Sequence, residues 1–133
     1  MPTIYTLAHP YVRASFTYTG SVETGVTLEF IGRPRISAEF FDAILNKFDG
    51  LMIPGGFRMS NPTPGGLGEW VKYHSKQLNP VRLYPRQASF IAAILVHEGY
   101  ISSSLDGNAV ILQFTGKNRT QAVDSPRAFP ASR

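Results

Sequence analysis

The sequence predicts an α+β fold with an N-terminal antiparallel hairpin, three helices and a C-terminal β-hairpin. Apolar residues alternate with period two near both ends of the chain and recur at helical spacing between them. The 133 residues are 43% hydrophobic and 17% charged, a globular composition of sufficient length for one core. We expect a single domain over residues 1–115 and a basic, flexible tail over residues 116–133.

The first part of the chain carries strand signals. Residues 4–7 are β-prone, and residues 15–19 and 26–30 each alternate in polarity, as half-buried strands do. Gly20 and Gly25 bracket the residues between the two longer segments. These segments are therefore predicted to pair as a hairpin with a longer loop.

A helix is predicted over residues 38–48. Ser37 has the hydroxyl of an N-cap residue, and Glu39 suits the positive end of the helix dipole. The apolar residues that follow form one helical stripe, and Gly50 supplies a C-terminal stop in the left-handed conformation.

Residues 51–66 are rich in glycine and proline and are predicted to form a long loop, of a kind that is often functional in small domains. Helical spacing resumes at Glu69, and Asn79-Pro80 ends this second helix. The residues predicted for its outward, polar face are Lys72, Ser75, Lys76 and Asn79.

Pro85 is placed to begin a third helix, where its missing N–H group costs nothing, and Gly99 ends that helix. A strand begins at Tyr100. Asp106-Gly107 marks a tight turn, and residues 109–114 alternate as the returning strand.

Positive charge is concentrated in two segments. Residues 58–86 contain five basic residues against Glu69, whereas residues 87–115 contain only two charged residues, both acidic. The tail from residue 116 is basic again. A localised excess of this kind favours a polyanionic partner, although a solvated face of a mildly basic protein has the same composition.

The segment from Leu95 to Ile101, a leucine followed by Gly99, an aromatic residue and isoleucine, leads directly into the predicted hairpin. Through residues 88–115, the chain resembles the winged helix-turn-helix family over about residues 68–115. The resemblance implies that the third helix enters the major groove of DNA and that the hairpin is the wing, with Asp106-Gly107 near its tip.

This resemblance and the charge pattern together predict a nucleic-acid-binding module, with DNA as the expected partner. Lys72, Lys76 and Arg82 would lie over phosphates, and Arg86 and Ser89 would contact a phosphate or a base edge. Small Ala93 would let the third helix approach closely. The predicted binding residues are Lys72, Lys76, Arg82, Arg86, Ser89 and, from the tail, Lys117 and Arg119.

The alternative is a protein-binding adaptor or inhibitor that acts through residues 51–66 and the second helix. The third helix is apolar almost all round from Phe90 to Val96, and Asp106 would repel phosphate at the tip of the wing. A helix followed by a hairpin also serves protein contacts, so the two interpretations stand side by side.

Four aromatic residues lie around the basic segment of the sequence. Aromatic rings between cations could stack on unpaired bases, but rings of this kind are more often part of a core, and that interpretation is favoured. The four residues are Phe57, Trp70, Tyr73 and Tyr84.

An enzyme is the minority interpretation. The segment from Pro64 to Gly68 matches no phosphate-binding motif and is predicted as a flexible connector, so a phosphate-handling enzyme has little support. The three histidines lack metal-site spacing and there is no cysteine, so we expect no metal and no cofactor. With no secretory signal, no long apolar run and no disulfide, a cytoplasmic protein is expected.

Overall fold

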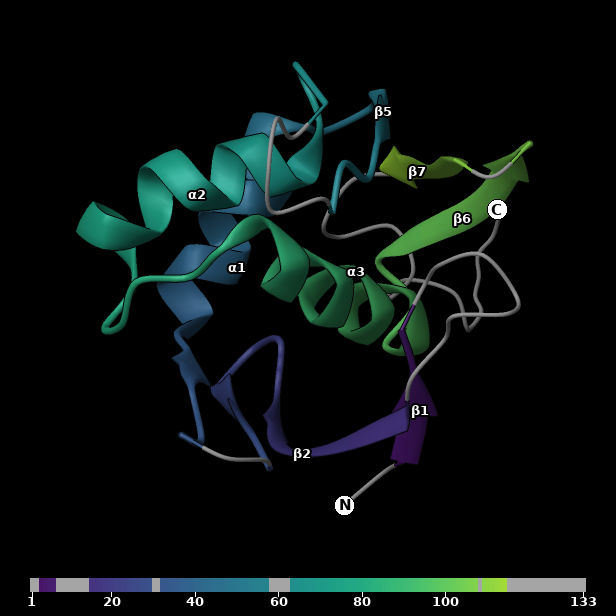
Figure 1. The fold of residues 1–133 in the computed structure, drawn as a ribbon. Coiled ribbons are helices and arrows are strands. Elements are labelled where there is room, and N and C mark those ends of the chain that lie inside the picture. Colours follow the sequence, from purple (N-terminus) through teal and green to yellow (C-terminus); the bar gives the residue numbers. More distant parts are fainter. Residues whose placement is uncertain (1–2, 7–14, 30–31, 58–62, 108, 115–133) are drawn as a thin grey trace, which may run out of the picture.

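The computed structural model describes residues 3–6, 15–29, 32–57, 63–107 and 109–114, and it has an α+β fold, as predicted. Its helices are α1 (Ala38–Lys47), α2 (Leu67–Leu78) and α3 (Ala88–His97), with a short 3₁₀ helix, η1 (Pro85–Gln87), directly before α3. In Figure 1, α3 crosses the centre of the molecule, with a curved sheet below it and α1 and α2 beside and above it.

The curved sheet is N-terminal and antiparallel, in the order β1-β2-β3-β4. The predicted hairpin is confirmed, although its strands run closer to the turn than expected. A short fourth strand forms where the sequence indicated only a break, because β3 has a free edge there. The strands are β1 (Thr3–Tyr5), β2 (Ser15–Ser21), β3 (Gly25–Leu28) and β4 (Arg35–Ile36).

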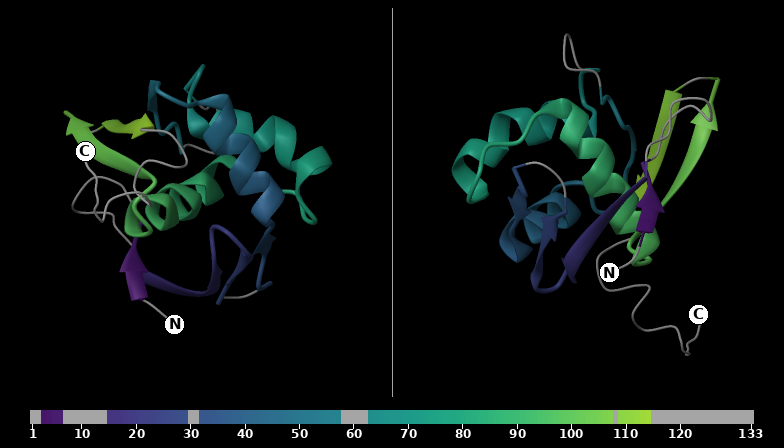
Figure 2. Two further views of the ribbon diagram at one scale, coloured as in Figure 1. Left: turned by 180° about the vertical axis from the view of Figure 1, so that it is seen from behind. Right: turned by 60° about the horizontal axis from the view of Figure 1, so that its bottom comes forward.

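The second sheet lies on the other side of α3 and has the order β5-β7-β6 (Figure 2). The predicted C-terminal hairpin is confirmed as β6 (Ile101–Asp106) and β7 (Ala109–Phe114). The prediction of a continuous loop over residues 51–66 is wrong at β5 (Met52–Pro54), which pairs with β7. No local pattern marks so short a strand, since its partner is almost sixty residues away.

The helix ends follow the capping signals in the sequence. Ser37 caps α1, its hydroxyl accepting the amide of Phe40 at 3.0 Å, and Gly50 has the predicted positive φ of 76°. α2 begins two residues before the predicted Glu69, and Pro85 is the first residue of η1 rather than of α3 itself. Asn79 ends α2, as expected.

One residue of α2 lies on a face other than the one predicted. Ser75 is fully buried, although the sequence predicted it on the outward face with the lysines. The inward residues are instead Leu67, Gly68, Val71 and Ser75. This small, partly polar stripe exists because α2 packs closely against the chain that leads to η1.

The core joins both sheets and all three helices in one cluster of buried residues. α3 is its centre: most of its residues, including Ile91, Ile94 and Leu95, are buried. Among the described residues, no helix has the length and apolarity needed to cross a membrane.

Candidate functional site

A buried serine fixes the chain between α2 and η1. The hydroxyl of Ser75 accepts the amide of Leu83 at 2.8 Å and donates to the carbonyl oxygen of the same residue at 3.2 Å. Both backbone groups of Leu83 are therefore satisfied by one side chain, as buried groups require. This pair of hydrogen bonds holds residues 82–84 alongside the last turns of α2.

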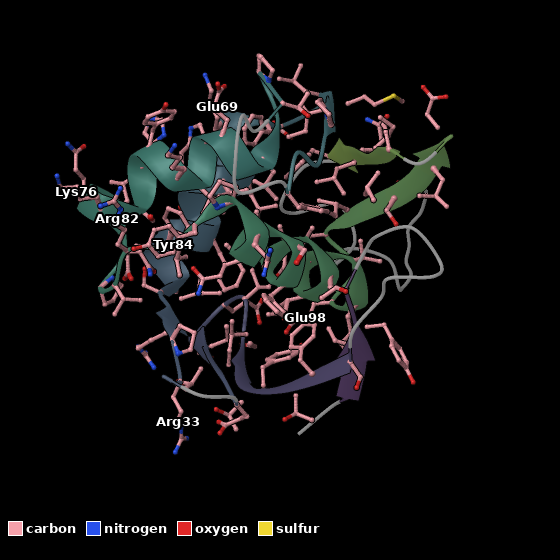
Figure 3. All side chains as sticks on the ribbon, viewed as in Figure 1. Arg33, Glu69, Lys76, Arg82, Tyr84 and Glu98 are labelled. Carbon is pink, nitrogen blue, oxygen red and sulfur yellow. The ribbon has the colours of Figure 1, made fainter. Side chains whose placement is uncertain are left out.

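Residues 82–84 are extended, so their side chains alternate in direction. Leu83 points inward and is fully buried, whereas Arg82 and Tyr84 are exposed. Lys76 follows Ser75 on α2, and Figure 3 shows it with Arg82 and Tyr84 around the C-terminal half of α2 and the chain that follows. We call Lys72, Lys76, Arg82, Tyr84 and Arg86 the basic surface.

Asn79 fixes the other end of this arrangement. Its side-chain carbonyl accepts the amide of Ser37 at 2.8 Å, and its amide nitrogen donates to the carbonyl oxygens of Arg35 and Val81, each at 2.8 Å. The end of α2 is thereby joined to β4 and to the start of α1. The end of α2 that carries Lys76 is consequently anchored to the rest of the fold.

Each of two exposed tyrosines has a cation over its ring. The guanidinium carbon of Arg82 lies 5.5 Å from the ring centroid of Tyr84, and Nζ of Lys72 lies 5.4 Å from that of Tyr73. Tyr73 is 63% exposed and Tyr84 is 43% exposed. The expectation that these aromatics belong to the core is therefore wrong for both tyrosines, whereas Phe57 and Trp70 do pack against the core.

The remaining predicted binding residues are placed differently from one another. Arg86 is exposed on η1, next to the extended segment. Ser89 is only 7% exposed, and its hydroxyl donates to the carbonyl oxygen of Arg86 at 2.7 Å, so it is bound to η1 instead of facing a partner. Lys117 and Arg119 lie outside the described residues.

The N-terminal sheet packs against α3, the helix that the resemblance would place in the major groove. Phe16 on β2 packs edge to face on Phe90 with 4.8 Å between centroids, and Ala93 is buried. Just after α3, Glu98 accepts hydrogen bonds from the hydroxyl of Tyr18 at 2.6 Å and the amide of Val22 at 2.9 Å. α3 is thus enclosed and offers no long polar face.

Tyr18 is the described residue whose ionisation the fold changes most clearly. Burial, with the adjacent Glu98 carboxylate as hydrogen-bond partner and as nearby negative charge, raises the pKa of the phenol well above its usual value. Tyr18 therefore stays protonated and donates to Glu98. Its role is to join the N-terminal sheet to the end of α3.

The hairpin β6–β7 lies on the opposite side of the molecule from the C-terminal end of α2 (Figures 1 and 2). Its strand β6 is exposed from Ser102 to Asp106 and carries one charge, which is negative. The hairpin and the cations therefore do not share a face, contrary to what the resemblance led us to expect.

The glycine-rich segment before α2 is used for close packing. The amide of Gly68 donates to the carbonyl oxygen of Gly55 at 2.8 Å, and that of Gly65 donates to Glu69 at 3.0 Å. A Cβ at Gly68 would overlap the carbonyl oxygen of Gly56. The start of α2 thus binds its own chain and a carboxylate, which leaves it unsuited to phosphate.

In the described part of the chain, His74 and His97 both contact aromatic side chains. His74 stacks on Trp70 with 4.4 Å between centroids, and its Nδ1 donates to the carbonyl oxygen of Trp70 at 2.9 Å. His97 meets the edge of Tyr18. Within the described ranges, no three histidine, aspartate or glutamate side chains gather as a metal site would require.

Comparison with known proteins adds no family to these observations. No family model matches the chain, and neither a curated protein nor a solved structure matches it. The site must therefore be interpreted from its own residues.

Tyr84 is the one residue of the basic surface that the sequence did not assign to binding, although its exposure has a local signal. The alternation of Arg82, Leu83 and Tyr84 is the signal of an extended segment with one inward side chain. By contrast, the roles of Ser75 and Asn79 depend on partners 8 and 42 or more residues away, which no local pattern reveals.

Proposed function

We propose that this protein binds nucleic acid through its basic surface and performs no catalysis there. The observation that carries the proposal is that four cations, Lys72, Lys76, Arg82 and Arg86, lie on α2, on η1 and on the chain between them, which Ser75 holds against α2. The ion pair between Arg33 and Glu29 in the described part of the chain involves none of these four cations.

The winged helix-turn-helix resemblance contributes only the order of helices and strands to the proposal. Its support is the order α1, β5, α2, α3 and the hairpin β6–β7, in which helices and hairpin follow one another as the resemblance implies. The proposed mode of binding differs from the family's, because α3 is enclosed and the hairpin lies away from the cations. Contact is therefore with phosphates, which gives affinity with little sequence preference.

A cytoplasmic location belongs to the same proposal, on the ground that the 133 residues contain no cysteine.

A protein-binding role is the second candidate. Leu51, Met52 and Leu105 are exposed on the second sheet, and Leu78 and Val81 are exposed at the end of α2. These apolar residues are spread over two separate parts of the molecule, whereas the cations gather in one. The positive charge of the basic surface therefore favours a polyanionic partner over a protein that binds exposed apolar residues.

The experiment that tests the proposal is fluorescence anisotropy with labelled DNA and RNA of random sequence across a range of salt concentrations. We expect the logarithm of the affinity to fall linearly with the logarithm of salt concentration. Lys76→Gln and Arg82→Gln should each reduce that slope by about one unit, since each removes one phosphate contact.

Lys47→Gln is the matched control, because it removes one exposed positive charge from α1, outside the basic surface. It should leave the slope unchanged. Absence of binding at about 50 mM salt, where phosphate contacts are strong, would contradict the proposal. An equal loss of slope in Lys47→Gln would contradict it too, because net charge rather than this surface would then govern binding.

A further inference from the structure

We infer that the basic surface takes single-stranded nucleic acid in preference to duplex, with unpaired bases stacked on Tyr84 and Tyr73. This inference rests on the proposed function and names the class of polymer that the same surface binds. It is carried by two exposed tyrosines, each of which lies against a cation.

The described structure has no exposed element beside the basic surface that could enter a groove of duplex DNA. Reading a duplex requires an element that enters a groove, and α3 is enclosed by β2 and the core. The exposed hairpin is remote from the cations and ends near Asp106, whose charge opposes phosphate. Neither element of the described structure supplies the groove contacts of a duplex-reading protein.

The basic surface does have an exposed aromatic ring, that of Tyr84, beside a cation. The backbone of Tyr84 is anchored because its amide donates to the side chain of Gln87 at 2.8 Å. The guanidinium of Arg82 lies over the ring, and 43% of Tyr84 remains exposed. An exposed aromatic ring beside a cation is what an unpaired base and its phosphate require.

Tyr73 lies on the outward side of α2 with Lys72 over its ring, and Lys76 follows one turn later on the same helix. Tyr73 therefore offers a second exposed ring beside a cation, next to the residues of the basic surface on α2. In a duplex the base faces are covered by their neighbours, so the tyrosines would have nothing to stack on.

The test compares a labelled oligo(dT) of about 15 nucleotides, the oligo(U) of the same length and a duplex of the same length in one anisotropy assay. We expect both single strands to bind more tightly than the duplex. Tyr84→Ala should weaken single-strand binding by at least about fivefold, because the loss of one stacked base has an effect of that size. Tyr73→Ala should act in the same direction.

Tyr84→Phe is the conservative variant and should retain single-strand affinity within about twofold, since it keeps the ring. Tyr5→Ala removes another exposed tyrosine, on β1 at the far side of the molecule, and should leave affinity unchanged. Circular dichroism confirms that each variant is folded before it is compared.

The outcomes separate the inference from the function on which it rests. Salt-dependent binding that is equal for duplex and single strands and indifferent to Tyr84→Ala would overturn the inference and leave the proposed function intact. Loss of all binding, or binding indifferent to Lys76→Gln and Arg82→Gln, would overturn both. A difference between oligo(dT) and oligo(U), with Tyr84→Ala weakening both, would support the inference and identify the preferred sugar.

Discussion

Ser75 shows how one hydroxyl can determine the shape of a surface that it does not itself reach. Both of its hydrogen bonds go to Leu83, and they turn Arg82 and Tyr84 outward by burying the residue between them. The cations of α2 and of the extended segment share a surface because of this contact.

Ser75→Ala should lower the free energy of unfolding by about 1–3 kcal/mol, because it leaves the buried amide of Leu83 without its partner. Urea denaturation followed by the fluorescence of Trp70, the single tryptophan, measures the change. Ser103→Ala is the control: it removes an exposed hydroxyl on β6 and should change stability by less than about 0.5 kcal/mol. Equal stability of Ser75→Ala and wild type would show that the two hydrogen bonds contribute nothing.

At the scale of elements, the attachment of the N-terminal sheet to α3 decides what α3 can do. The sequence predicted the sheet's hairpin, the three helices and the C-terminal hairpin from local patterns of polarity, caps and turns. It could not predict that β2 covers α3, because that contact joins Tyr18 to Glu98, which is 80 residues away. An apolar pattern on almost all sides of a helix indicates burial, but it does not name the element that buries it.

The hydrogen bond between Tyr18 and Glu98 makes the free energy of unfolding depend on pH, and the sign of this dependence follows from the pKa of Tyr18. The pKa of Tyr18 is raised in the folded protein, so above its usual value of 10.0 the unfolded chain loses a proton that the folded chain keeps. The stabilisation is complete below pH 10 and is lost as the pH rises further. We expect the free energy of unfolding of the wild type to fall there by up to about 1.4 kcal/mol per pH unit more steeply than that of Tyr18→Phe.

Urea denaturation of the two proteins between pH 8 and pH 11 measures this difference. Tyr18→Phe also loses the hydrogen bond to Glu98, so its stability is lower at neutral pH, and the comparison uses the slopes alone. Parallel pH profiles of the two proteins would contradict the assigned role of Tyr18.

At the scale of the molecule, charge and shape divide the protein into two sides. On one side, α2 and the chain to η1 carry the basic surface and Tyr73. On the other side, the hairpin β6–β7 carries exposed serines and Asp106. Of the seven binding residues expected from the sequence, four lie on the basic surface, Ser89 is buried, and Lys117 and Arg119 lie outside the described residues. Residue type was enough to find the cations, whereas the tyrosines required knowledge of their exposure.

The central claim is that nucleic acid meets the basic surface and not α3 or the hairpin. Titration of ¹⁵N-labelled protein with unlabelled oligo(dT), followed by the amide chemical shifts, tests it most directly. We predict that the amide signals of residues 72–76 and 82–86 change position as the oligo(dT) concentration rises. The amide signals of residues 90–96 and 102–106 should not change. Shifts concentrated in β6, β7 or α3, with the amides around Ser75 and Leu83 unmoved, would contradict the account.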